Sequence, residues 1–150
     1  MGKGNLAADN QLSMIGEAVI QLLFQDTVLS GLVAKRIRPN VVKTDDLKTG
    51  GAAISVLDYR MEKMGCDDSS NVYNGVLEIA VYSTDYKLAV KVIKNIRRVM
   101  DDYSGFITLV SGEGVVGLTI SRGEGTPDDY DESGTTHIKV IEYEAYAQIQ

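Results

Sequence analysis

Hydrophobic and polar positions follow two successive periods in residues 75–105, and this stretch organises the rest of the chain. Residues 76–82 alternate, with Leu77, Ile79 and Val81 on one side, as in a strand that buries one face. After residues 83–85 the period lengthens to that of a helix, with apolar positions at Leu88, Ala89, Val92, Ile93, Ile96, Val99 and Met100. The pattern predicts a strand that leads directly into an amphipathic helix, which is the core of an α+β domain.

The ends of this helix carry signals of their own. Ser83 or Thr84 can accept hydrogen bonds from the free N–H groups of the first turn. Asp85 places a negative charge at the positive end of the helix dipole. Gly105 is expected to stop the segment in the left-handed conformation.

Residues 1–42 predict two helical segments and then extended chain. Residues 1–10 are polar, and we expect them to be loose. Asp9 or Asn10 caps a first helix that ends near residues 24–25, and Asp26 caps a short second turn. Pro39 disfavours helix in the residue before it, and residues 41–42 fit a short edge strand. The apolar positions are Leu12, Ile15, Val19, Leu22 and Leu23 in the first segment, and Val28, Leu29, Leu32 and Val33 in the second.

The remaining segments read as strands and loops. Residues 52–60 alternate as a strand, after a polar, glycine-ended loop at residues 43–51. Residues 61–74 predict either a long hairpin loop or two strand ends that extend beyond the sheet. Residues 106–110 and 115–122 are two short strands around a turn, and residues 123–134 form an acidic, turn-rich loop. Residues 137–149 form a long last strand, with Ile141, Tyr143, Ala145, Ala147 and Ile149 on one face.

The order of these elements predicts the fold class. Links of hairpin length favour an α+β fold with a mostly antiparallel sheet of about four to five strands and two helices packed on one face. At 150 residues the chain is expected to be one domain, 1–150, with a core that needs no disulfide.

Composition and charge narrow the classes of function. The net charge of −6 disfavours general nucleic-acid binding, because such binding needs an excess of cations that face phosphates. Cys66 is the single cysteine, so no internal disulfide can form and a four-ligand zinc site is not expected. The N-terminus lacks the apolar core of a signal peptide, and no run of the sequence predicts a membrane span. We expect a protein that is made in the cytoplasm and does not act at a membrane.

The sequence offers little catalytic chemistry. His137 is the single histidine and begins a strand, while Cys66 has no nearby cation to lower its pKa. The acidic run in residues 128–132 lacks the ligand spacing of a calcium loop. The Gly-Glu-Gly segments at residues 112–114 and 123–125 do not open helices, so they are not phosphate loops. We expect no enzymatic activity, no cofactor and no metal.

Two surfaces could carry function. A basic stripe on the predicted helix, formed by Lys87, Lys91, Lys94 and Arg98, is either a solvated face or a contact with an acidic surface of a neighbouring subunit or of DNA. Tyrosines are concentrated in loops and on strand faces that one helical layer cannot fully cover. Core packing explains most of them, but exposed ones favour interfaces. These are Tyr73, Tyr82, Tyr130, Tyr143 and Tyr146.

From about Ile15 to its end, the chain resembles the phage tail-completion proteins, also called tail-terminator or head–tail joining proteins, of long-tailed bacteriophages. The resemblance rests on the order of several segments rather than on one sharp motif. They are the first helix, the turn at residues 26–32 with residues 36–39, the segment Tyr73-Asn74-Gly75 that opens a strand, the helix at residues 86–100 with residues 101–105, and the acidic loop at residues 127–131 before the terminal strand. The chain departs from the family pattern at residues 43–51, which are not rich in proline.

The resemblance implies a structural protein of the virion. Such proteins form a ring, commonly a hexamer, on the head-proximal end of the tail tube. The ring ends polymerisation of the major tail tube protein and joins the tail to the head–tail connector. The resemblance also implies the tape-measure protein as a further partner. Genomic DNA passes through the lumen, and an acidic protein can line such a channel without trapping DNA.

These implications lead to candidate interface residues. A ring seam would join two different patches, the basic stripe and a strand face that carries Glu142, Glu144 and Tyr146. The loops that would contact the tube or the connector contain Lys43, Asp45, Asp46, Lys48, Met61, Lys63, Met64 and Tyr73. The alternative is a small α+β module that binds a ligand or protein and is unrelated to virions.

Overall fold

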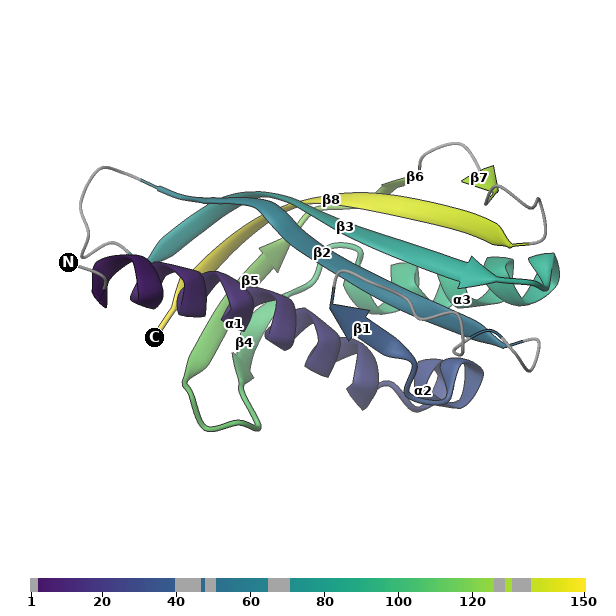
Figure 1. The fold of residues 1–150 in the computed structure, drawn as a ribbon, viewed down its shortest axis with the longest axis horizontal. Coiled ribbons are helices and arrows are strands. Elements are labelled where there is room, and N and C mark those ends of the chain that lie inside the picture. The colour runs from purple at the N-terminus through teal and green to yellow at the C-terminus, as the bar shows by residue number, and fades with distance from the viewer. Residues whose placement is uncertain (1–2, 40–46, 48–50, 65–70, 126–128, 131–135) are drawn as a thin grey trace.

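The computed structural model describes residues 3–39, 47, 51–64, 71–125, 129–130 and 136–150. These residues form one curled sheet with helices on one side (Figure 1). Its helices are α1 (Lys3–Gln25), α2 (Thr27–Val33) and α3 (Tyr86–Met100). Its strands are β1 (Ile37–Pro39), β2 (Ala52–Lys63), β3 (Val72–Ser83), β4 (Ser104–Thr108), β5 (Val115–Ile120), β6 (Glu124–Gly125), β7 (Asp129–Tyr130) and β8 (His137–Ile149).

Strand β8 is the centre of the sheet. β3 pairs with one edge of β8 along its length, while β5, β6 and β7 pair in succession with the other edge. The main order is β1-β2-β3-β8-β5-β4 in an eight-stranded sheet. The pairings are antiparallel except that of β1 with β2, which is parallel.

The predicted α+β class is therefore confirmed, but the finer prediction is wrong in part. The described residues contain three helices and eight strands, and the sheet is mixed. The additional strands have two or three residues each, too few to produce a period in the sequence. The predicted second turn is a seven-residue helix, α2.

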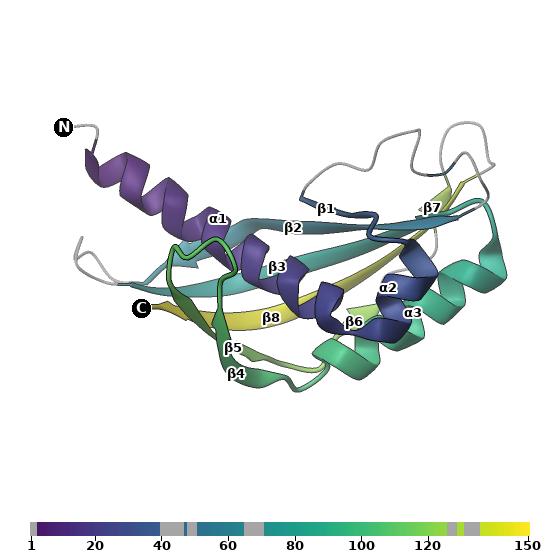
Figure 2. The ribbon, with the colours of Figure 1, turned by 90° about the horizontal axis from the view of Figure 1, so that it is seen from below.

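The core lies between the helices and one face of the sheet. Ile141, Tyr143 and Ala147 of β8 are buried on this face, as the alternation predicts. α3 covers β3 and β8, while α1 covers β1 and β2 (Figures 1 and 2). The buried side chains of α3 are Ala89, Val92, Ile96 and Met100, which recur at helical spacing.

The sheet curls so that strands near both of its ends reach α1 (Figure 2). Gln21 of α1 fixes the far end of β4. Its amide nitrogen donates to Thr108 O at 2.7 Å, and its amide oxygen accepts from Val110 N at 3.0 Å. One carboxamide thus satisfies the last carbonyl of the edge strand β4 and an N–H group just beyond its end, much as a neighbouring strand would.

Several predicted boundaries need correction. α1 begins at Lys3, so residues 3–10 are helical rather than loose, and neither Asp9 nor Asn10 is its cap. The cap of α3 is Asp85, which accepts from Lys87 N and Leu88 N, because Ser83 is buried and accepts from Asp85 N instead. Gly105 lies inside β4, and the left-handed residue after α3 is Asp102, with φ 59°.

The segment at residues 61–74 follows the second of its two predicted alternatives. β2 continues to Lys63 and β3 begins at Val72, and the two extensions pair with each other. The turn between them at residues 65–70, the edge strand predicted at residues 41–42 and most of the loop at residues 43–51 lie outside the described residues.

Candidate interface on the open face of the sheet

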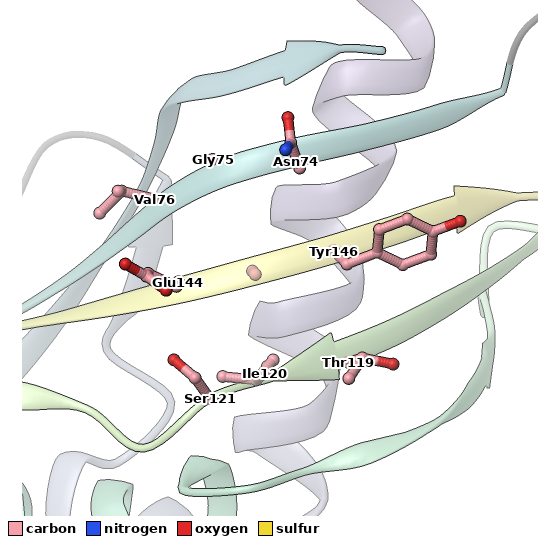
Figure 3. A pocket seen from close by; sticks show the side chains of 9 residues that line it. Asn74, Gly75, Val76, Thr119, Ile120, Ser121, Glu144 and Tyr146 are labelled. Carbon is pink, nitrogen blue, oxygen red and sulfur yellow. The ribbon is translucent and has the colours of Figure 1, made fainter.

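The sheet surface opposite the helices, which we call the open face, is hollowed (Figure 3). The main hollow has a volume of about 610 Å³ and lies across β3, β8 and β5. Two smaller hollows of about 470 Å³ and 110 Å³ adjoin it, because they share lining residues such as Glu144 and Tyr146 with it. Together they form a groove that runs from β4 to β6.

Gly75 forms part of the floor of the main hollow (Figure 3). Its φ of 149° is rarely adopted by other residues, and a Cβ there would overlap the backbone oxygen of Arg60. The register of β2 and β3 shifts between Leu57 and Arg60, which is a β-bulge. The close approach of β2 and β3 at this bulge therefore requires glycine.

Three carboxylates form a row across adjacent strands on the open face. Glu78 is the register partner of Glu142, and Glu142 is the register partner of Glu124. Arg60 Nη1 bridges two of them, at 3.1 Å from Glu78 Oε1 and 3.2 Å from Glu142 Oε1. We call these three glutamates the acidic row. Glu144, two residues further along β8, is exposed on the same face.

Aromatic and polar side chains occupy the other end of the groove. Phe106 is 68% exposed although it is a large hydrophobic residue, and its ring lies over its register partner, Gly117. Tyr146 is 43% exposed and points away from the core (Figure 3). An exposed pair of aromatic side chains is typical of surfaces that bind another protein.

The predicted basic stripe is divided in the structure. Lys87, Lys91 and Lys94, which we call the α3 lysines, are exposed. Arg98 is not free, because its Nη2 lies 2.6 Å from Asp26 Oδ2, and this bond lowers the pKa of Asp26. The available positive charge of α3 is therefore concentrated in its first two turns and a half.

The predicted loop residues have different positions. Met61, Lys63 and Tyr73 lie in strands, and Met61 and Tyr73 are buried, so their assignment to loops is wrong. Met64 is exposed just after β2. The remaining four predicted loop residues lie outside the described part of the chain. They are Lys43, Asp45, Asp46 and Lys48.

Tyr143 illustrates how the tyrosines divide between core and surface. This residue of β8 is fully buried on the core face of the sheet. Burial raises the pKa of its phenol, and the nearby carboxylate of Asp101 raises that pKa further. Gly123 packs against its ring and is tied to Arg97 and Asp101 by hydrogen bonds of 3.0 and 3.2 Å. Tyr143 and Tyr73 therefore serve the core, whereas Tyr146 belongs to the open face.

The single histidine, His137, is the first residue of β8. His137 packs edge-on against Tyr86, with ring centroids 5.4 Å apart, and Lys139 lies over the same Tyr86 ring. Among the described residues, His, Cys, Asp and Glu nowhere gather in a group of three that could hold a metal ion. In the part of the chain that is described, no helix is long and apolar enough to cross a membrane.

Part of the open face has no signal in the sequence. Arg60 and Glu124 join Glu142 only through the bulge in β2 and the two-residue strand β6, and neither feature has a periodic signal. In the sequence Phe106 belongs to a short apolar run, and only the register of β4 with β5 places its ring outside.

Comparison with known proteins places the fold. No family model and no curated protein matches the chain. A chain in a structure described as "Virion of native gene transfer agent (GTA) particle" matches with a TM-score of 0.53 and 17% identity, over 88% of this chain and 91% of that chain. A second solved structure, whose name describes no function, matches with a TM-score of 0.53 and 12% identity, over 88% of this chain and 94% of that chain. At these identities, the two comparisons show a shared fold.

Proposed function

We propose that this protein is a structural component of a phage-like virion and that it forms the terminator ring of a tail. The observation that carries the proposal is the fold shared with a chain of a gene transfer agent virion, which extends over nearly the whole length of both chains. The order of segments that resembles the tail-completion family supports the finer assignment to the tail terminus.

The surface of the molecule is suited to assembly. An exposed groove with aromatic side chains and more carboxylates than cations lies on one side of the sheet, and exposed lysines lie on the other. A subunit with two different complementary surfaces can form closed rings through heterologous contacts. The net charge of −6 suits a ring whose lumen DNA must cross without being held.

In this proposal the ring is hexameric and sits at the head-proximal end of the tail tube. It contacts the major tail tube protein on one side and the head–tail connector on the other, with the tape-measure protein as a further contact. The protein has no enzymatic role and needs no cofactor. It acts in the virion after synthesis in the host cytoplasm.

Removal of the gene from the encoding phage or particle tests this function. We expect heads without attached tails and tubes of abnormal, variable length in negative-stain electron micrographs, because nothing ends tube polymerisation. Expression of the wild-type protein from a plasmid should restore uniform, joined tails. His137→Ala should restore them equally, since no chemistry depends on the imidazole. Joined tails of normal length without the gene would refute the proposal.

The groove itself favours a second candidate, a binding module unrelated to virions. A hollow of about 610 Å³ has the size of many ligand sites, although it is open and partly polar. Such a module would remain a monomer and would not associate with purified particles. Co-sedimentation of the protein with virions therefore separates the two functions.

A further inference from the structure

The acidic row is an unfavourable arrangement within one isolated chain. Like charges directly opposite each other on neighbouring strands destabilise a sheet. Here Glu78, Glu142 and Glu124 occupy one such line, and Arg60 is the single cation that bridges any of them in the described residues. Glu144 adds a further carboxylate beside the main hollow. Arg122 lines the adjoining hollow with three of these carboxylates, so two arginines face four glutamates here. The excess of two negative charges would be stabilised by a cationic partner.

The α3 lysines provide the complementary charge. Residues 87, 91 and 94 are spaced four and three apart, so their side chains project from the same side of α3. The structure gives them no ion pair with any described carboxylate. α3 packs on the helical side of the sheet, so these lysines cannot reach the open face of their own chain (Figures 1 and 2).

We propose that α3 of one copy docks on the open face of the next copy, with its lysines against the acidic row and Glu144. This inference deepens the ring proposed above and rests on it. Phe106 and Tyr146, which are exposed on the open face, would pack against the docked helix and exclude water from the groove.

The dimensions of the two surfaces agree. α3 has 15 residues, and a helix of this size is about 22 Å long. The open-face stretch of β8 from Glu142 to Gln148 is about 20 Å long at the usual rise of a strand. The contact is heterologous, so each copy uses both surfaces, and repetition around a closing rotation gives a ring.

Two charge-reversed variants test the seam. The helix variant carries Lys91→Glu and Lys94→Glu, and the sheet variant carries Glu124→Lys and Glu144→Lys. The substitutions avoid Glu78 and Glu142, which hold Arg60, so that the fold of the open face is retained. The matched control carries Lys35→Glu and Glu113→Lys, at exposed positions that belong neither to α3 nor to the lining of the groove. Circular dichroism and thermal melting establish that all three variants are folded.

Sedimentation velocity should show the wild type and the control as the same oligomer, and each reversed variant alone as a monomer. An equimolar mixture should recover the oligomer, because every contact between a helix variant and a sheet variant again joins opposite charges. Native mass spectrometry should then give an even number of chains in a 1:1 ratio, since the two variants must alternate. The wild-type oligomer should also weaken in high salt, because salt screens exposed charges.

Three results would overturn the inference. They are a wild type that remains monomeric, a reversed variant that keeps the wild-type oligomer, and a mixture of folded variants that stays monomeric. The outcome is separable from that of the gene removal above. If tail assembly requires the gene but charge reversal leaves the oligomer unchanged, the proposed function is retained and the proposed contact is refuted. If the mixed variants recover the oligomer but tails are normal without the gene, the contact is retained and the function is refuted.

Discussion

Arg98 of α3 and Asp26, the N-cap of α2, form an ion pair with Nη2 and Oδ2 2.6 Å apart. The same carboxylate oxygen accepts from Leu29 N at 3.0 Å, so one atom caps α2 and joins it to α3. This relationship explains why Arg98 does not contribute to the charge that α3 presents to a partner.

The pair predicts a pH-dependent stability. The bond to Arg98 lowers the pKa of Asp26, so its contribution is complete above the pKa of an unfolded aspartate and is lost as the pH falls through the lower folded value. Asp26→Ala should reduce the free energy of unfolding by about 1–2 kcal/mol at pH 7, since both cap and pair are lost. Asp26→Asn keeps a cap and should cost less. Urea unfolding from pH 7 to pH 2 checks this, and a penalty independent of pH would contradict it.

Asp58 should give the free energy of unfolding the opposite dependence on pH. Burial raises its pKa, while backbone N–H groups of Asp58 and Gly16 oppose that shift. Ionisation of Asp58 therefore destabilises the fold as the pH rises through the interval from its unfolded to its raised folded pKa. Asp58→Asn should be more stable than wild type at pH 7, by less than about 1 kcal/mol because the side chain is partly exposed to water. Its advantage should disappear below the pKa of an unfolded aspartate, and an advantage that persists there would refute the explanation.

Gly75 and Gly31 form a matched pair of substitutions. Gly75→Ala should cost about 1–3 kcal/mol or more, because the backbone conformation is strained for alanine and its Cβ would overlap Arg60 O. Gly31 lies in α2 with open space around it, so Gly31→Ala should stabilise the protein by about 0.5–1 kcal/mol. Denaturant unfolding of both variants measures the contrast. Equal effects would contradict a special requirement for glycine in the floor of the groove.

The side chain of Gln21 should protect the backbone amide of Val110, just beyond the end of β4, from hydrogen exchange. In Gln21→Ala the amide hydrogen of Val110 loses its acceptor, so its hydrogen exchange should accelerate by about fivefold if the bond contributes about 1 kcal/mol. Gln21→Glu keeps an acceptor for Val110 but loses the donor to Thr108 O, and its effect at Val110 should be smaller. Exchange measured by NMR decides this, and unchanged exchange in both variants would show that the carboxamide does not protect the edge.

Local patterns predicted the parts of the fold that local patterns determine. The period change after Tyr82 located β3 and α3, and the alternation in residues 137–149 identified the core face of β8 without error. The sequence predicts the cap of α3 one or two residues too early, because serine, threonine and aspartate can all cap and burial selects among them.

The candidate site depends on register, which the sequence does not display. Glu78, Glu142 and Glu124 lie far apart along the chain, and only the pairing of β3, β8 and β6 places them in one row. Arg98 matched the helical spacing of the α3 lysines, but its use by Asp26 depends on how α2 packs. Charges on a predicted helix face are therefore candidates for an interface only after the intramolecular partners are known.

Cryo-electron microscopy of the particle that encodes this protein would show whether the protein forms a ring at the head-proximal end of a tail. We expect a closed ring of copies of this fold between the tail tube and the connector, with α3 of each copy against the open face of its neighbour. A neck map whose ring is built from a different fold, with this protein absent from the particle, would contradict it.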